Sequence, residues 1–214
     1  ASLISCANTK NLIGVAPESK LFIGKIDNTG GFDDFKIFAD AIIWASNIEE
    51  IDIISISNGL SDPNQEDKTL PILKAALDFA ALKNKIVIAA IGDKANDPNP
   101  LYPALYEKCI SVGATDSTGA CWDGNAESPL TTIYAPGVTV FSNSNNGELI
   151  SLSGNSQAAA IVAGITALIV SHLKSKNVKY TTEYISEIIT KYSGAASNNN
   201  SKILISPLKI FSNI

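Results

Sequence analysis

Ser156 is the residue of this chain whose surroundings suit covalent chemistry. It follows several small residues and begins an apolar stretch that carries no charge until Lys174. The stretch predicts a helix that is buried on nearly every face and is too short to cross a membrane. A serine at its start would hold its hydroxyl where the partial positive charge of the helix gathers. The alternative is a packed helix that Ser153, Asn155 or Ser156 merely caps.

A serine hydroxyl is a weak nucleophile until a base removes its proton, a third group orients that base, and donors receive the developing oxyanion. The sequence has one histidine, His172, sixteen residues after Ser156 in the same predicted helix. At about 1.5 Å of rise per residue, His172 lies roughly 24 Å from the serine. It therefore cannot be the base, and we interpret it as a helix-end residue near the negative pole of the helix dipole.

Composition limits the class of protein and its partners. The 214 residues are 45% hydrophobic and 17% charged, which predicts one globular domain spanning residues 1–214. The net charge is −5 and no Lys/Arg-rich run occurs, so we expect neither nucleic acid nor a membrane as a partner. No signal peptide pattern follows Ala1. Because the sequence contains no methionine, we expect Ala1 to follow a removed initiator or to lie inside a longer chain.

The cysteines point to structural thiols. Cys6, Cys109 and Cys121 are few and widely spaced, which argues against a disulfide framework and against a zinc site. We expect them to be reduced, and this slightly favours an intracellular location without establishing one.

Strand and helix patterns alternate along the chain. Buried apolar runs predict parallel strands near Leu21–Ile26, Ile51–Ile56, Lys85–Ile91 and Ile110–Ala114. Helical patterns lie between them and after them, including a helix that Asp33 or Asp34 caps, one over Leu70–Leu82, and one capped by Thr181 or Thr182. This alternation predicts an α/β fold with three layers, in which a mostly parallel sheet carries helices on both faces.

The serine stretch resembles the active-serine segment of the subtilisin-like serine proteases, the subtilases, whose pattern is Gly-Thr-Ser-Met-Ala-x-Pro-His-Val-Ala-Gly. The residues that match are Gly154, Ser156, Ala158, Val162, Ala163 and Gly164. Those that depart from it are Asn155, Gln157, Ala160 and Ile161. Further segments resemble the family in the same order from about Val15 to Ile205, among them the Ala-Pro-Gly turn at residues 135–137. The resemblance implies a subtilisin-like fold with Ser156 at the nucleophile position.

The resemblance also implies parts that this sequence lacks. The family's His-Gly-Thr and Asp-Ser/Thr-Gly motifs do not occur in residues 1–214, and its first strands are expected to be missing. In the family, a central strand that carries the catalytic aspartate lies between the counterparts of Leu21–Ile26 and Ile51–Ile56. Without that strand, Leu21–Ile26 must pair directly with Ile51–Ile56 or leave a gap that another chain fills.

Asp93 falls on the family's oxyanion position, where an asparagine is usual. An ionised Asp93 would repel the oxyanion, and the loss of one good donor typically costs about 100- to 1,000-fold in rate. A protonated carboxyl could still donate a hydrogen bond. One branch of kexin-type relatives also carries aspartate here, so this change alone does not exclude activity. The alternative is a solvated turn residue in the run Gly92-Asp93-Lys94.

In the family, two strand ends pair with an extended substrate. The residues at the corresponding positions are Ser57, Asn58, Gly59, Ala90, Ile91 and Gly92. Their small side chains suggest that an extended peptide binds here by strand addition, and we expect no cofactor. Subtilases often bind calcium. Residues 8–12 are too short for the family's calcium loop, and the acidic residues near Asp62 and Asp67 lack suitable spacing, so no metal is expected.

Two functions follow from these observations. We favour a catalytically inactive subtilisin-like domain that binds a peptide or protein, because the histidine and aspartate motifs are absent and the oxyanion position is altered. The alternative is a subtilisin-like serine endopeptidase whose catalytic Asp and His lie on a missing or separate N-terminal segment, with Ser156 as the nucleophile. In that case the N-terminal segment would be a partner of this chain.

Overall fold

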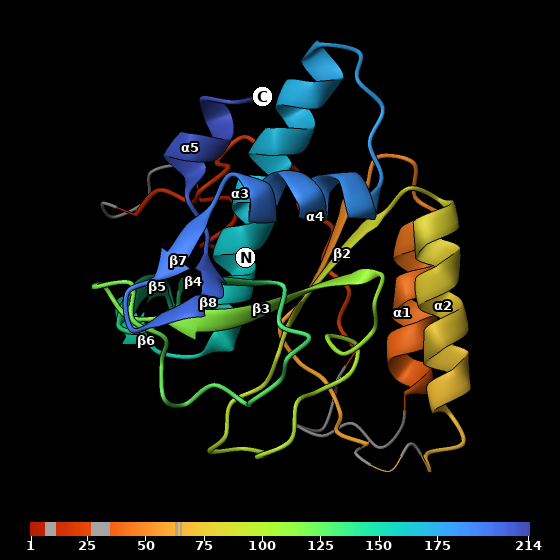
Figure 1. The fold of residues 1–214 in the computed structure, drawn as a ribbon. Helices are drawn as coiled ribbons and strands as arrows, with labels where there is room; N and C mark the ends of the chain where they lie inside the picture. Colours follow the sequence, from red (N-terminus) through yellow and green to blue (C-terminus); the bar gives the residue numbers. More distant parts are fainter. Residues whose placement is uncertain (7–11, 27–34, 63, 65) are drawn as a thin grey trace.

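A computed structural model describes residues 1–6, 12–26, 35–62, 64 and 66–214 of the chain (Figure 1). Within these residues, the main sheet has the strand order β1-β2-β3-β4-β8-β7. The strands from β1 to β8 in this order pair in parallel, and β7 pairs with β8 antiparallel. The predicted mostly parallel sheet is therefore confirmed. The strand bounds are β1 Ile53–Ile56, β2 Ile86–Ala90, β3 Cys109–Thr115, β4 Ile133–Pro136, β7 Gly194–Ala196 and β8 Asn199–Leu204.

Helices cover both faces of this sheet. Helices α1 (Lys36–Ser46) and α2 (Leu70–Leu82) form one layer, and α3 (Asn155–Ser175) packs on the other face with α4 (Thr182–Lys191) and α5 (Pro207–Phe211) (Figure 1). The side chains of β2 alternate between the two cores. Ile86 and Ile88 lie in the core with α3, whereas Val87 and Ala89 lie in the core with α1 and α2. This two-sided burial explains why β2 is apolar throughout.

The prediction of a strand at Leu21–Ile26 is wrong. Residues 21–26 are described but form no ladder, and β1 is the outer strand on that side of the sheet. The chain before this segment is held elsewhere, because the backbone N–H groups of Val15 and Ala16 donate to the carbonyls of Leu3 and Ile4 at 3.0 and 2.8 Å. Direct pairing with β1 does not occur, and a pocket separates β1 from residues 18–24.

Other differences lie near the C-terminus and at the helix ends. Residues 193–201 look like a polar loop in the sequence, but they contribute β7 and the start of β8. A small second sheet, β5 (Val140–Asn143) with β6 (Leu149–Leu152), has no clear sequence signal. The predicted cap of α4 is confirmed, because Thr181 Oγ1 accepts the N–H of Tyr184 at 3.2 Å. The proposed Asp33 or Asp34 cap lies outside the described residues.

Helix α3 is long enough to reach the length of a membrane span. It runs for 21 residues, and its apolar window has a mean hydropathy of 1.6, so by length and composition it passes as a possible membrane span. The expectation that the stretch is too short for a span is therefore wrong. In this fold 61% of that window is buried inside the protein, which is typical of the core helix of a folded domain. Buried alanines such as Ala158, Ala159 and Ala163 allow its close packing on the sheet.

Candidate active site

The candidate site forms where the first turn of α3 meets the ends of β1 and β2. These two strands are parallel neighbours, with Ile56 opposite Ala89, so their carboxyl ends open at the same edge of the sheet. Ser57 follows β1 and Asp93 follows β2, and both contact the start of α3. Crevices beyond the carboxyl ends of the strands are the usual place for ligands in open α/β sheets. The two strand ends that the resemblance assigns to substrate pairing therefore follow neighbouring strands of the sheet.

Ser156 is the second residue of α3 and is partly exposed. Its Oγ donates a hydrogen bond to the carbonyl oxygen of Ser57 at 2.9 Å, and Ser57 Oγ donates to the carbonyl of Ser156 at 3.2 Å. A peptide carbonyl accepts a hydrogen bond but is far too weak a base to take the serine proton. The hydroxyl is thus held in a structural contact between α3 and β1.

The single histidine of the chain lies at the opposite end of α3. The Nε2 atom of His172 is 3.3 Å from the carbonyl oxygen of Ile214, close to the C-terminus of the chain. The helix continues without interruption from Asn155 to Ser175. About 1.5 Å of rise per residue places the imidazole more than about 20 Å from Ser156. Ser156 therefore has no imidazole of its own chain within hydrogen-bond reach.

Asp93 caps α3 from the end of β2. One carboxylate oxygen, Oδ1, accepts the backbone N–H of Asn155 at 3.0 Å and the Asn155 side-chain Nδ2 at 2.5 Å. The same Nδ2 donates to the carbonyl oxygen of Gly92 at 2.7 Å. A negative charge at a helix N-terminus is stabilised by the free N–H groups and by the helix dipole. The Asp93 carboxyl group therefore occupies the N-terminus of α3, directly before Ser156.

The expected caps of α3 are wrong. The N-cap residue is Gly154, which has no side chain, and Ser153 instead accepts the backbone N–H of Thr139 at 2.9 Å. A Cβ atom at Gly154 would lie 3.0 Å from Asp93 Oδ2 and 3.0 Å from Gln157 Oε1. The close approach of Asp93 thus requires a small residue at position 154. Two further acceptors at this end, Asn155 Oδ1 and Gln157 Oε1, are buried without a hydrogen-bond partner.

The second half of the predicted peptide edge, residues 90–92, is buried. The carbonyl oxygen of Ile91 accepts the N–H of Leu101 at 2.9 Å, and the carbonyl oxygen of Gly92 accepts the N–H of Ala126 at 2.8 Å. These two carbonyls are already used inside the protein. In this structure they are not free to pair with an added peptide.

The first half of the predicted edge is more open. Ser57 and Asn58 are exposed, and the Asn58 side chain accepts the N–H of Gly59 at 2.8 Å. Gly59 itself lies against the next segment, since a Cβ atom there would be 2.2 Å from the carbonyl oxygen of Tyr102. The accessible part of the edge is therefore Ser57 and Asn58.

Sequence reasoning missed Asn125, which holds the loop beside the site. Its side chain is 3% exposed. Oδ1 accepts the N–H of Ala114 at 2.7 Å, while Nδ2 donates to the carbonyls of Ala114 and Trp122 at 2.9 and 2.7 Å. These bonds place the neighbouring Ala126 against Gly92. An asparagine in a polar Asp-Gly-Asn run gives no local signal of this role, because Ala114 lies eleven residues away on the buried strand β3.

The acidic residues considered for calcium have other partners. Both carboxylate oxygens of Asp62 accept backbone N–H groups, from Glu66 and from Asp67. Asp67 accepts hydrogen bonds from the side chain and backbone of Thr69, which lower the pKa of its carboxyl. Among the described residues, no group of three or more His, Cys, Asp or Glu side chains is placed to hold a metal ion. The proposed short loop at residues 8–12 lies almost entirely outside the described residues.

Comparisons with known proteins agree with one another on the family. Residues 1–203 match the model of the subtilase family, peptidase S8. Subtilisin DY from Bacillus licheniformis is 32% identical over 194 residues, which are 89% of this chain and 66% of that protein. Thermitase from Thermoactinomyces vulgaris is 27% identical over 86% of this chain and 63% of its own length.

Solved structures show the same fold at lower identity. The patellamide maturation protease PatA superposes with a TM-score of 0.86 at 23% identity, covering 99% of this chain and 80% of its own. The PatG macrocyclase in complex with peptide gives a TM-score of 0.86 at 19% identity, over 99% of this chain and 66% of its own. The chain thus spans about two thirds of the length of subtilisin DY and of thermitase.

Proposed function

Because this chain belongs to the subtilase family, we propose that residues 1–214 act as a catalytically inactive subtilisin-like domain that binds a peptide or protein. The observation that carries the proposal is the hydrogen bond from Ser156 Oγ to the carbonyl of Ser57 at 2.9 Å. A serine hydroxyl held by a carbonyl, with the only imidazole at the far end of the helix, has no base to activate it. Ser156 then acts as a structural link between α3 and β1.

The surroundings of Asp93 support the same proposal. Transition-state stabilisation in acyl transfer requires hydrogen-bond donors aimed at a developing negative charge. Here the first N–H of α3 already donates to the Asp93 carboxylate. An oxyanion formed beside Ser156 would lie close to this carboxyl group, which accepts hydrogen bonds and supplies no donor when it is ionised.

The binding half of the proposal rests on the exposed edge after β1. Ser57 and Asn58 are exposed there, beside the partly exposed Ser156. A neighbour of the same fold, the PatG macrocyclase, has a structure in complex with a peptide. We therefore assign Ser57 and Asn58 to contact with an extended peptide.

A pair of matched substitutions tests this binding. The Asn58→Arg variant places a long charged side chain on the proposed edge, whereas Asn145→Arg makes the same change at an exposed position before β6. A fluorescein-labelled library of extended octapeptides is titrated against the wild-type chain and both variants. We expect Asn58→Arg to weaken binding by about tenfold and Asn145→Arg to leave it unchanged. Equal affinity for all three proteins would contradict binding at this edge. Gly59 is unsuitable for this test, because any side chain there would meet Tyr102.

The alternative function is a serine endopeptidase in which a separate segment supplies the Asp and His. The partly exposed position of Ser156 at the start of α3 favours it, as does the pocket beside β1. Co-expression of the chain with the residues encoded upstream of Ala1 separates the two functions. Peptidase activity that appears only in the co-expressed complex, and is lost in Ser156→Ala, would establish the alternative.

A further inference from the structure

The sequence contains two Asn-Gly pairs, Asn58-Gly59 and Asn146-Gly147. In such a pair the backbone nitrogen of the glycine can attack Cγ of the asparagine side chain, because glycine has no Cβ atom to hinder the approach. Both asparagines are exposed, so access of solvent does not distinguish the two pairs. The hydrogen bonds around each pair do distinguish them.

At Asn58 the atoms that would react already lie close together. The N–H of Gly59 donates to Asn58 Oδ1 at 2.8 Å. Since a C=O bond is about 1.23 Å long, the Gly59 nitrogen lies within about 4.0 Å of Asn58 Cγ. Reacting atoms about 3–3.5 Å apart are in position for attack. Ring closure at Asn58 therefore starts from a geometry that is close to the one it needs.

The turn that contains Asn58 is fixed on both sides. Before it, the carbonyl of Ser57 accepts the hydroxyl of Ser156 at 2.9 Å. After it, Leu60 and Tyr102 exchange two backbone hydrogen bonds, at 3.1 and 2.9 Å. These anchors keep the Asn58 side chain beside the glycine nitrogen.

At Asn146 the same groups have other partners. The N–H of Gly147 donates to the carbonyl of Ser144 at 3.0 Å, in the turn that joins β5 to β6. Asn146 Oδ1 accepts the hydroxyl of Ser144 and, at 3.3 Å, the N–H of Glu148. Its Nδ2 donates to Glu148 Oε2 at 3.1 Å. The hairpin therefore directs the Asn146 amide toward residues 144 and 148 instead of toward the glycine nitrogen.

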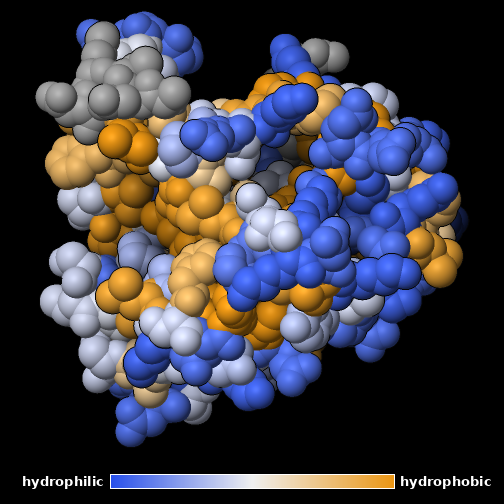
Figure 2. All heavy atoms as spheres, turned by 90° about the horizontal axis from the view of Figure 1, so that it is seen from above, coloured by the Kyte–Doolittle hydropathy of each residue, from blue (hydrophilic) through white to orange (hydrophobic). Residues whose placement is uncertain are grey.

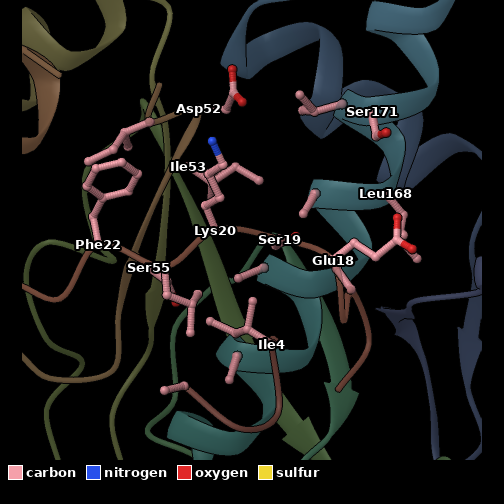
Figure 3. A pocket seen from close by; sticks show the side chains of 18 of the residues that line it. Ile4, Glu18, Ser19, Lys20, Phe22, Asp52, Ile53, Ser55, Leu168 and Ser171 are labelled. Atoms are coloured by element: carbon pink, nitrogen blue, oxygen red, sulfur yellow. The ribbon is translucent and has the colours of Figure 1, made fainter. Parts of the chain in front are cut away.

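The turn at Asn58 lies at the open end of the sheet. It follows β1, the strand that carries Ile53 and Ser55 in Figure 3. The carboxyl ends of β1 and β2 are at the lower side of the molecule in Figure 1, so the apolar surface seen from above in Figure 2 lies at the opposite end. Because Asn58 is exposed, water and hydroxide can reach it.

We propose that Asn58 is a site of spontaneous deamidation, in which the Gly59 nitrogen is the nucleophile. Hydroxide removes the Gly59 N–H proton, the nitrogen bonds to Asn58 Cγ, and the Cγ–Nδ2 bond breaks. Nδ2 leaves as ammonia with a proton from water, which regenerates the hydroxide. Water then opens the resulting succinimide at either carbonyl and leaves aspartate or isoaspartate at position 58. One water is consumed and one ammonia is released.

Both products change the edge that follows β1. A carboxylate at position 58 adds a negative charge beside Ser57, and its effect on peptide binding rests on the proposed function. Isoaspartate also lengthens the main chain by one carbon. Gly59 has little room to shift, since a Cβ atom there would lie 2.2 Å from the carbonyl oxygen of Tyr102. The isoaspartate product should therefore weaken the backbone bonds between Leu60 and Tyr102.

The test compares the two Asn-Gly pairs within the same molecules. The 214-residue chain is kept at mildly alkaline pH in water enriched in heavy oxygen, either folded or unfolded in guanidinium chloride. Proteolysis in ordinary water and tandem mass spectrometry give the modified fraction at each asparagine, and one heavy oxygen marks hydrolysis of the succinimide. In the folded chain we expect Asn58 to react at least about tenfold faster than Asn146, and in the unfolded chain the two rates should agree within about threefold.

Three results would overturn the proposal. They are equal rates in the folded chain, faster reaction at Asn146, and a tenfold preference for Asn58 that persists in the unfolded chain, which would assign the preference to the local sequence. Asn58→Gln is the control, because its longer side chain closes a larger ring much more slowly. This variant should show no mass change at position 58 and an unchanged rate at Asn146.

The consequence for binding is tested separately. Asn58→Asp introduces the negative charge without the extra main-chain carbon. In titrations with the labelled octapeptides, we expect Asn58→Asp to favour lysine-containing over glutamate-containing peptides by about threefold relative to the wild-type chain. An unchanged preference would contradict an effect of the charge at this edge. If the unmodified chain binds no octapeptide, the proposed function fails, whereas deamidation at Asn58 is still decided by the mass spectra.

Discussion

Asp93 accepts the backbone N–H of Asn155 at 3.0 Å, so a carboxylate from the end of β2 caps the helix that carries Ser156. This contact joins residues that are 62 positions apart in the sequence. It gives Asp93, which the family resemblance places at the oxyanion position, a structural role. The start of α3 is stabilised by an anion that belongs to the protein itself.

Removal of this cap should destabilise the fold. We expect Asp93→Ala to lower the free energy of unfolding by about 1 kcal/mol, because the first N–H of α3 loses its acceptor. Asp93→Asn should cost less, since an amide oxygen can still accept. Urea denaturation measures both. The exposed Asp123→Ala variant serves as the control, and a loss as large in the control as in Asp93→Ala would argue against the cap.

Gly164 should resist substitution although it lies inside α3. Alanine is favoured over glycine in a helix by about 1 kcal/mol, but a Cβ atom here would lie 2.6 Å from Val15 Cβ. We expect Gly164→Ala to destabilise the protein by about 1–3 kcal/mol through overpacking. In a double-mutant cycle, Val15→Gly, which removes the contacting Cβ atom, should recover part of this loss. Simple additivity of the two substitutions would show that the contact does not limit the packing.

The ion pair between Asp78 and Lys108 should make stability depend on pH. Hydrogen bonds from Lys108 and from Tyr106 lower the pKa of the Asp78 carboxyl in the folded state. The contribution is therefore present above the unfolded pKa of about 3.9 and is lost as the pH falls through the folded pKa. We expect Asp78→Asn to be less stable than wild type at pH 7, with the difference shrinking below about pH 3.5. Urea denaturation across this range measures it, and a difference that grows toward low pH would contradict the assignment.

The thiols should differ in reactivity. Cys109 is buried in β3, and burial raises the pKa of its thiol well above the usual range, whereas Cys121 is partly exposed. Thiolates are the reactive form, so a disulfide reagent such as Ellman's reagent should modify Cys121 before Cys109 in the native protein. Mass spectrometry of partly modified samples gives the order. Early modification of Cys109 would mean that β3 opens readily in the native state.

Local sequence patterns predict the covered strands well. The sequences of β1, β2 and β3 are apolar because helices lie on both faces of these strands. Burial on both faces can therefore be recognised from each strand's own sequence. Leu21–Ile26 has a similar pattern but forms no strand. A strand needs a neighbour at hydrogen-bonding distance, and no local pattern reports whether that neighbour is present.

The candidate active site could also be predicted only in part from the sequence. Helix geometry alone separates His172 from Ser156, because both lie on one continuous helix. The contacts of Ser156 with Ser57, of Asn155 with Asp93 and of Asn125 with Ala114 join distant parts of the chain. Each depends on the tertiary fold, so the sequence offered candidate residues but not their partners.

Labelling of Ser156 by a fluorophosphonate probe tests the central claim most directly, because such a probe reacts rapidly only with an activated serine. The 214-residue chain and its Ser156→Ala variant are incubated with the probe, and the labelled fraction is followed by in-gel fluorescence. If the domain is inactive, we expect the wild-type chain and the Ser156→Ala variant to be labelled at the same slow background rate. Rapid labelling of the wild-type chain that is lost in Ser156→Ala would contradict the account and show that Ser156 is an activated nucleophile.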